Sequence, residues 1–234
     1  MKISPRSNSS RPVAIRSARW PRKGLIGLRF TVSMLVLIAA CGIFGDITED
    51  VVTGDSTVKT DFVVANFFYE RTTPTITATM KALSFFGSIG FLTSAAALFA
   101  IHLGWRRKWH DLLLLLSVVP GGMLFNVIVK HIVGRHRPIF ENPLLTLKSY
   151  SFPSGHTMGA TLFYGLLAVL VVLSGCRWPS KVFTVFSAIL IISLVGFSRI
   201  YLGVHYLSDV LGAIAASVAW LTLCLSAGDA LSRR

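Results

Sequence analysis

Three short stretches in the second half of the chain bring together residue types that bind anions and transfer protons. They are KHIVGRHRP at 130–138, FPSGH at 152–156 and SRIYLGVHYLSD at 198–209. Lysine and arginine side chains bind phosphate groups, and histidine transfers protons near neutral pH. These stretches therefore raise the hypothesis of a site that holds a compact anion and carries out acid–base chemistry beside it.

The first stretch predicts two cations on one face of a helix. Lys130 and Arg137 are seven residues apart, which is about two turns at 3.6 residues per turn. Pro138 ends the helix because it cannot continue the hydrogen-bond ladder. The alternative is a pair of cations whose charged ends reach water at the end of a membrane helix.

The second stretch predicts a helix N-terminus that faces an oxyanion. Ser154 offers a hydroxyl, and the first N–H groups of a helix lack partners inside it. Gly155 has no Cβ, so an anion can approach the backbone closely. His156 follows directly, where it can transfer a proton to or from the bound group.

The third stretch predicts a histidine–carboxylate pair beside another cation. His205 and Asp209 are four residues apart, so they share one face of a helix. A carboxylate behind an imidazole fixes its tautomer and stabilises its positive form. Gly203 suits the turn before this helix, and Arg199 ends the helix that precedes the turn. The alternative for such a histidine is a purely structural hydrogen-bonding role.

The composition places these stretches in a membrane protein. Of the 234 residues, 53% are hydrophobic and only 14% are charged, whereas soluble proteins carry about 25% charged residues. Strands of alternating polarity are absent, so we predict an all-α polytopic membrane helix bundle with about six transmembrane helices. The expected spans are residues 28–45, 82–104, 111–133, 156–174, 181–198 and 207–226.

The distribution of charge predicts the orientation of this bundle. With a cytoplasmic N-terminus, fifteen of the 23 basic residues fall inside and eight of the ten acidic residues fall outside. Both termini are then cytoplasmic, and the net charge of +13 reflects membrane orientation, so no nucleic-acid partner is predicted. Six costly polar groups then share the outer face of the membrane. They are Lys130, Arg137, His156, Arg199, His205 and Asp209.

The expected domain organisation is simple. We divide the chain into a basic cytoplasmic tail at 1–27, a membrane domain at 28–226 and a short cytoplasmic tail at 227–234. The three cysteines are too few and too scattered for a disulfide framework or a zinc site. Residues 38–41 resemble a lipoprotein processing signal, but the basic segment before them is long for a signal peptide, so we favour helix packing for Cys41.

The segment between the first two spans is predicted to lie at the membrane surface. Its aromatic residues Phe62, Phe67, Phe68 and Tyr69 are typical of a membrane interface. The spacing of its acidic residues fits no calcium loop, so we predict a solvated outer face rather than a metal site. These acidic residues are Asp46, Glu49, Asp50, Asp55 and Asp61.

Taken together, the three stretches resemble the signature motifs of the type 2 phosphatidic acid phosphatase superfamily. The resemblance covers residues 130–209 in the order and spacing of the family, and no signature position departs from the pattern. The matching residues are Lys130 with Arg137-Pro138, then Pro153-Ser154-Gly155-His156, then Ser198-Arg199 with His205 and Asp209.

The resemblance implies a role for each of these residues. His205 would attack phosphorus and form a phosphohistidine, Asp209 would orient His205, and His156 would protonate the leaving oxygen and then activate water. The family implies no metal and no cofactor, because the cations neutralise the charge that magnesium neutralises elsewhere. The phosphate oxygens would be bound by Lys130, Arg137, Ser154, Gly155 and Arg199.

The partner implied by the resemblance is a lipid phosphate whose tail stays in the bilayer. Bacterial members act on polyprenyl (undecaprenyl) diphosphate, phosphatidylglycerophosphate, phosphatidic acid, diacylglycerol diphosphate or lipid A phosphates. Arg135, His136 and Lys148 are near enough in sequence to help bind a second phosphate, although we favour solvated loop charges. A lipid phosphotransferase and a non-catalytic lipid-binding or transport protein are the alternatives. Oligomeric state does not follow from the sequence.

Overall fold

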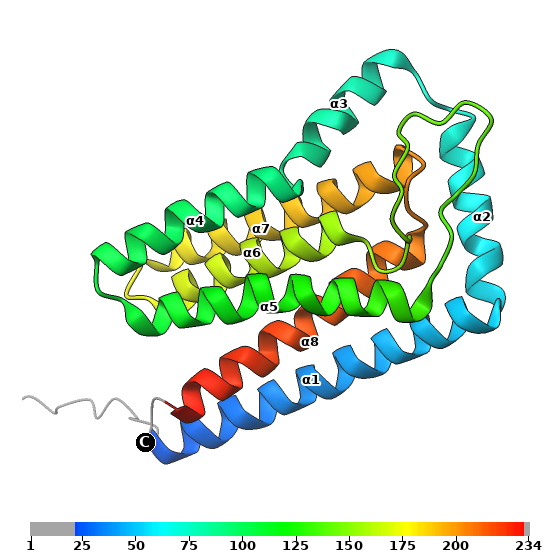
Figure 1. Cartoon of the computed structure of the whole chain (residues 1–234). Coiled ribbons are helices and arrows are strands. Elements are labelled where there is room, and N and C mark those ends of the chain that lie inside the picture. Colours follow the sequence, from blue (N-terminus) through cyan, green and yellow to red (C-terminus); the bar gives the residue numbers. More distant parts are fainter. Residues whose placement is uncertain (1–21, 232–234) are drawn as a thin grey trace, which may run out of the picture.

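The computed structural model describes residues 22–231, which form a bundle of helices (Figure 1). Six segments in this part of the chain are long and apolar enough to cross a membrane, so the predicted all-α membrane bundle is confirmed. The described helices are α1 (Arg22–Thr53), α2 (Ser56–Tyr69), α3 (Pro74–Phe85), α4 (Ile89–Trp105), α5 (Trp109–Val133), α6 (Gly155–Leu173), α7 (Trp178–Tyr201) and α8 (Leu207–Leu231).

Helix α6 forms the centre of the bundle and contacts α4, α5, α7 and α8. Its residues Met158, Leu162 and Leu166 are completely buried. They belong to one apolar cluster with Val118 of α5 and Ala213 of α8. Its 19 residues span about 28 Å at 1.5 Å per residue, close to the thickness of the hydrocarbon layer. Because α6 is about as long as the hydrocarbon layer is thick, a membrane-spanning α6 has its first turn near one boundary of that layer.

The predicted span at 82–104 is divided into two helices, α3 and α4. Ser88 begins α4, because its side chain accepts a hydrogen bond from the Phe91 N–H at 3.3 Å. At the corner between the helices, a Cβ on Gly87 would lie 2.4 Å from Val195 Cγ1 and 3.1 Å from the His156 carbonyl oxygen. Only glycine permits this approach, so Gly87 allows α3 to pack along α7 while α4 packs on α6.

The loops that follow α5 and α7 gather at one end of the bundle, and α2 lies across the same end (Figure 1). Gly134 ends α5 in the left-handed conformation, with φ of 62°, and its N–H donates to the Lys130 carbonyl. The prediction that Pro138 ends this helix, with Lys130 and Arg137 on one helical face, is therefore wrong, and Arg137 lies in the loop after α5. The first described residues of α1 and the last of α8 lie together at the opposite end. Residues 1–21 of the predicted basic tail lie outside the described residues, and α8 continues past the predicted boundary at 226 to Leu231.

The aromatic residues of α2 differ in their surroundings. Phe62 and Phe67 are about half exposed, as expected for interfacial residues. Phe68 packs edge-on against Phe197 of α7 with ring centroids 5.2 Å apart, and Tyr69 stacks on Phe140 at 4.1 Å. Phe68 and Tyr69 therefore join α2 to the bundle and to the loop after α5, and the interfacial position of the four residues stays a prediction.

Candidate functional site

All of the residues predicted for the site lie at the end of the bundle that α2 covers. They come from the last turn of α5 and the loop after it, the start of α6 and the residue before it, the last turn of α7, the loop that follows α7, and the first turn of α8. The residues are Lys130, Arg137, Ser154, Gly155, His156, Arg199, His205 and Asp209.

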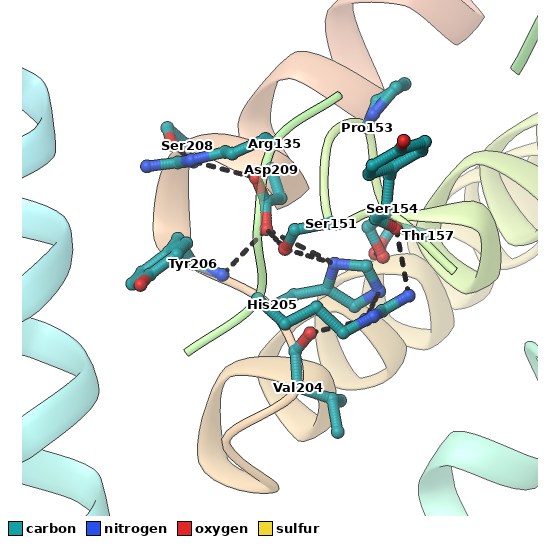
Figure 2. Close-up of polar contacts among 12 residues, drawn as sticks. Arg135, Ser151, Pro153, Ser154, Thr157, Val204, His205, Tyr206, Ser208 and Asp209 are labelled. Atoms are coloured by element: carbon teal, nitrogen blue, oxygen red, sulfur yellow. Dashed lines mark hydrogen bonds and ion pairs between the residues drawn. The ribbon is translucent and has the colours of Figure 1, made fainter. Parts of the chain in front are cut away.

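The Asp209 carboxylate is the centre of a hydrogen-bond network (Figure 2). Its Oδ2 accepts from His205 Nδ1 at 3.2 Å, from the Tyr206 N–H at 2.9 Å and from the Ser151 hydroxyl. The Tyr206 bond is half of a capping box, in which an acidic residue in the first helical turn accepts from the residue before the helix. Asp209 therefore caps the N-terminus of α8 and also contacts the His205 imidazole.

The hydrogen bonds of His205 assign its tautomer. Arg137 Nη1 lies 3.1 Å from His205 Nε2, and a guanidinium can only donate, so Nε2 is the acceptor. The proton is then on Nδ1, facing Asp209. Burial lowers the pKa of His205 to about 3, against the raising effect of Asp209, and the charges of Arg137 and Arg199 lower it further. His205 is thus a neutral imidazole whose Nε2 lone pair is directed toward Arg137.

Lys130 and Arg137 converge on the same backbone carbonyl. Lys130 Nζ donates to the Tyr150 carbonyl at 2.8 Å, and Arg137 Nη2 donates to the same oxygen at 3.1 Å. Burial lowers the pKa of Arg137 below its ordinary value. No carboxylate of the described residues is within ion-pair distance of either cation. Both positive charges are therefore available to an anion.

Arg199 is a buried cation with unused hydrogen-bonding capacity. It is only 3% exposed, and its Nη1 donates to the hydroxyl of Ser84 in α3 at 2.6 Å. Its Nε is buried and has no partner among the described residues. A buried donor without an acceptor is costly, and an anion in the site would supply that acceptor. Sequence reasoning missed Ser84, because nothing in α3 indicated that it would reach the end of α7.

The start of α6 has the features expected of an anion-binding turn. Ser154 is completely buried, and its hydroxyl accepts from Thr157 Oγ1 at 3.0 Å, which leaves its own proton free to donate. A Cβ on Gly155 would lie 3.4 Å from Asn126 Oδ1 and 4.0 Å from Lys130 Cε, so the turn lies directly beside the end of α5.

Asn126 is a supporting residue that sequence reasoning missed. It is 1% exposed, and its Nδ2 donates to the Pro153 carbonyl at 3.3 Å. The contact holds the turn that leads into Ser154. The available signal was an amide in an apolar span, one helical turn before Lys130.

His156 has no hydrogen-bond partner for its ring among residues 22–231. The charges of Lys130, Arg137 and Arg199 all act on this ring, which places it beside the cations. Its backbone lies against Gly87 at the corner between α3 and α4. His156 is thus held through its main chain, and its imidazole is free to contact a bound group.

Two residues outside the predicted set take part in the network, and for both the sequence interpretation is wrong. Asp61 was expected on a solvated face, yet its side chain is 1% exposed and lies 2.8 Å from Arg135. Arg135 was expected to be a solvated loop charge, yet it also pairs with Asp209 at 2.7 Å. Burial alone would lower the pKa of Arg135, but the carboxylates of Asp209 and Asp61 raise it. Arg135 is therefore not available for a second phosphate.

The other two candidates for a second phosphate, His136 and Lys148, line a cavity of about 500 Å³ between the loop after α5 and the turn before α8. Arg137 borders the same cavity, whereas His156, Arg199 and His205 do not. Within the described part of the chain, no three His, Cys, Asp or Glu side chains are grouped so that they could hold a metal ion.

The site residues lie in the part of the chain that matches a protein-family model. The model described as the PAP2 superfamily matches residues 111–233, which is more than half of the chain. The chain belongs to the PAP2 superfamily. The resemblance seen in the three motifs is therefore confirmed, and it extends over α5 to α8, which supply most of the site.

Known members of the PAP2 superfamily resemble this chain in sequence and fold. Phosphatidylglycerophosphatase B of Bacillus subtilis is 34% identical over 144 residues, covering 61% of this chain and 70% of the relative. An undecaprenyl-diphosphatase of the same organism is 32% identical over 101 residues, covering 42% and 47%. The crystal structure of a transmembrane phosphatidylglycerolphosphate phosphatase of the PAP2 type from Bacillus subtilis matches with a TM-score of 0.74 and 28% identity, covering 84% of this chain and 98% of that one. These similarities support a membrane lipid phosphatase.

Proposed function

We propose that this PAP2 protein hydrolyses a lipid phosphate through a phosphohistidine intermediate, without a metal ion. The observation that carries the proposal is the arrangement around His205 Nε2. A neutral, buried imidazole is held on one side by Asp209 and contacts Arg137 on the other. Arg137, Lys130 and Arg199 all lack a carboxylate partner among the described residues. Three fixed positive charges in a buried site favour a compact dianion.

In the first step, His205 Nε2 attacks phosphorus and the bond from phosphorus to the lipid oxygen breaks. Arg137 Nη1, which contacts Nε2 in the empty site, moves onto a phosphate oxygen and frees the lone pair. Lys130 and Arg199 bind the other oxygens, with the Ser154 hydroxyl and the Gly155 N–H. The negative charge of the bound phosphate favours the protonated form of His156, which donates its proton to the leaving lipid oxygen and becomes neutral.

In the second step, His156 takes a proton from water, and the resulting hydroxide attacks the phosphohistidine. The nitrogen–phosphorus bond breaks, so inorganic phosphate leaves and the neutral imidazole is restored. Asp209 stabilises the positive charge on the imidazole while the phosphoryl group is attached, through its contact with Nδ1. Each step inverts phosphorus, so the two steps together retain its configuration.

The substrate that we propose is a lipid phosphate or diphosphate whose tail remains between the helices and the bilayer. The names of the two Bacillus subtilis relatives indicate phosphatidylglycerophosphate and a polyprenyl diphosphate as the first compounds to test. A panel of phosphatidylglycerophosphate, undecaprenyl diphosphate and phosphatidic acid, given to the purified protein with and without EDTA, tests the proposal. We expect free phosphate from at least one lipid, at a rate that EDTA does not change.

Two results of this experiment would contradict the proposal. Loss of activity in EDTA with recovery on adding magnesium would contradict the metal-free mechanism. Phosphate transferred to an acceptor lipid, with no free phosphate, would indicate a phosphotransferase. The His205→Ala protein serves as the blank, because it keeps the fold and the cations but lacks the nucleophile.

We further propose that the site opens on the periplasmic or extracellular side of a bacterial inner membrane, with both termini in the cytoplasm. The charge distribution supports this orientation. A membrane-impermeant thiol reagent applied to intact spheroplasts should label a Lys148→Cys variant, since Lys148 is in the exposed loop beside the site. Native Cys176 is exposed between α6 and α7 at the opposite end, so it should react only after the membrane is disrupted. The reverse pattern would invert the orientation.

A further inference from the structure

Arg135 lies between two buried carboxylates that come from different helices. Its Nη2 donates to Asp61 Oδ2 of α2 at 2.8 Å, and its Nη1 donates to Asp209 Oδ1 of α8 at 2.7 Å. The Ser208 hydroxyl accepts from Arg135 at 2.7 Å and donates to Asp61 at 2.5 Å. We call Asp61, Arg135 and Ser208 the Arg135 clamp. It connects α2 and the loop after α5 to the carboxylate that contacts His205.

The clamp determines which oxygen of Asp209 faces His205. The terminal torsion of an aspartate has only broad preferences, so hydrogen bonds set the plane of the carboxylate. Arg135 occupies Oδ1, which leaves Oδ2 for His205 Nδ1. Without Arg135, the carboxylate would be held through Oδ2 alone and could rotate away from the imidazole.

Arg135 is itself held in place. Its guanidinium lies 4.3 Å from the centre of the Tyr206 ring, and its side chain is only 9% exposed. Asp61 fixes the far side of the guanidinium and also accepts the Ser208 N–H at 3.0 Å, in the first turn of α8. Loss of the Asp61 charge would leave Arg135 with Asp209 as its one carboxylate partner in the described chain, and the guanidinium would move toward it.

We propose that Arg135 and Asp61 are positioning residues for the phosphatase reaction. They hold Asp209 so that its Oδ2 supports Nδ1 of His205, which directs Nε2 toward the phosphorus atom. The inference rests on the proposed role of His205 as the nucleophile. Neither residue contacts the substrate in this scheme, because the phosphate is bound by Lys130 and the other free cations.

The two variants that test this proposal are Arg135→Gln and Asp61→Asn, which remove charge with little change in size. We expect kcat to fall by about 10-fold to 100-fold, the effect of losing one charged hydrogen bond. KM should change by less than about threefold, because the phosphate-binding cations are untouched. The matched controls are Arg71→Gln and Asp55→Asn, which make the same changes at exposed positions next to α2 and should leave kcat unchanged.

A double-mutant cycle distinguishes positioning from a general effect on the fold. If Arg135 and Asp61 act through Asp209, then Arg135→Gln and Asp61→Asn should lower kcat by no more than about threefold in an Asp209→Asn background. An equal loss in both backgrounds would overturn the proposal. Ser208→Ala, which removes one hydroxyl from the clamp, is the milder variant if either charge change prevents folding, and it should show the same dependence on Asp209.

Binding of orthovanadate gives a readout that does not depend on turnover. Vanadate adopts the five-coordinate geometry of the transition state when a nucleophile binds it. The affinity for vanadate therefore depends on whether His205 Nε2 is oriented toward the position of the phosphorus atom. Both variants should bind vanadate about tenfold or more weakly than the wild type and the controls. A wild-type protein that binds vanadate but releases no phosphate from any lipid would contradict the proposed function alone. If both variants keep the vanadate affinity and the kcat of the wild type, the positioning role is contradicted.

Discussion

Replacing His205 with alanine is expected to lower kcat by about 10⁴-fold or more, because the nucleophile has no substitute within the site. His205 is completely buried, and its Nε2 is the imidazole nitrogen that faces Arg137 and the other cations. Phosphate release from the most active lipid of the panel measures the effect. The phosphorylated protein should also disappear, and this is measured after a rapid alkaline quench, because phosphohistidine survives base but not acid.

His110→Ala is the matched control for this prediction. His110 is an exposed histidine at the far end of the bundle, in the first turn of α5, and its loss should leave kcat within about twofold of the wild type. Full activity in His205→Ala would remove the covalent mechanism. A covalent phosphate that persists in that variant would move the nucleophile to another residue, with His156 the first to test.

The second large effect is expected from Arg199→Gln, which should lower kcat/KM by about 10²-fold to 10³-fold. The same change should raise the Tm of the empty protein. Arg199 is buried beside two other cations, it has no carboxylate within ion-pair distance in the described chain, and its Nε lacks an acceptor. Its charge therefore costs free energy until an anion binds, and neutralising it removes this cost. Thermal unfolding and phosphate release together test the prediction.

Arg177→Gln is the control at the opposite end of the same helix, where the side chain is exposed. It should change neither the Tm nor the kinetics. Inorganic phosphate should stabilise the wild type more than Arg199→Gln, because at the same concentration a ligand that binds more tightly adds more to the free energy of unfolding. A lower Tm with unchanged activity in Arg199→Gln would show that Arg199 serves packing and that another group binds the phosphate.

The membrane bundle and the principal site residues could be predicted from the sequence because both depend on local patterns. Apolar runs of the length of the bilayer predict helices whatever their neighbours. The spacing of His205 and Asp209 alone indicated that their side chains meet at the start of a helix. The prediction that Lys130 and Arg137 share a helical face was wrong, because α5 ends at Val133 and Arg137 lies in the loop that follows. The positive-inside pattern placed the four helix ends on one side of the membrane. The structure places these four ends together at one end of the bundle.

The contacts between distant elements could not be predicted in this way. Ser84 reaches Arg199 only because Gly87 lets the corner between α3 and α4 approach α7. A hydropathy pattern carries no information about such a corner, since residues 86–88 between the two helices do not interrupt the apolar run. The sequence therefore predicted one continuous span at 82–104, where the structure has the end of α3 and most of α4.

Asp61 and Arg135 show most clearly what only the tertiary structure decided. In the sequence each is a charged residue in a polar segment, for which exposure to solvent is the ordinary expectation. In the structure they meet across 74 positions, and Arg135 also pairs with Asp209. Burial of a charge is tolerated only when a partner of opposite sign is close, and that partner comes from another helix. The sequence determined which groups are candidates for the chemistry, whereas the packing of α2 against α8 decided how the carboxylate beside His205 is held.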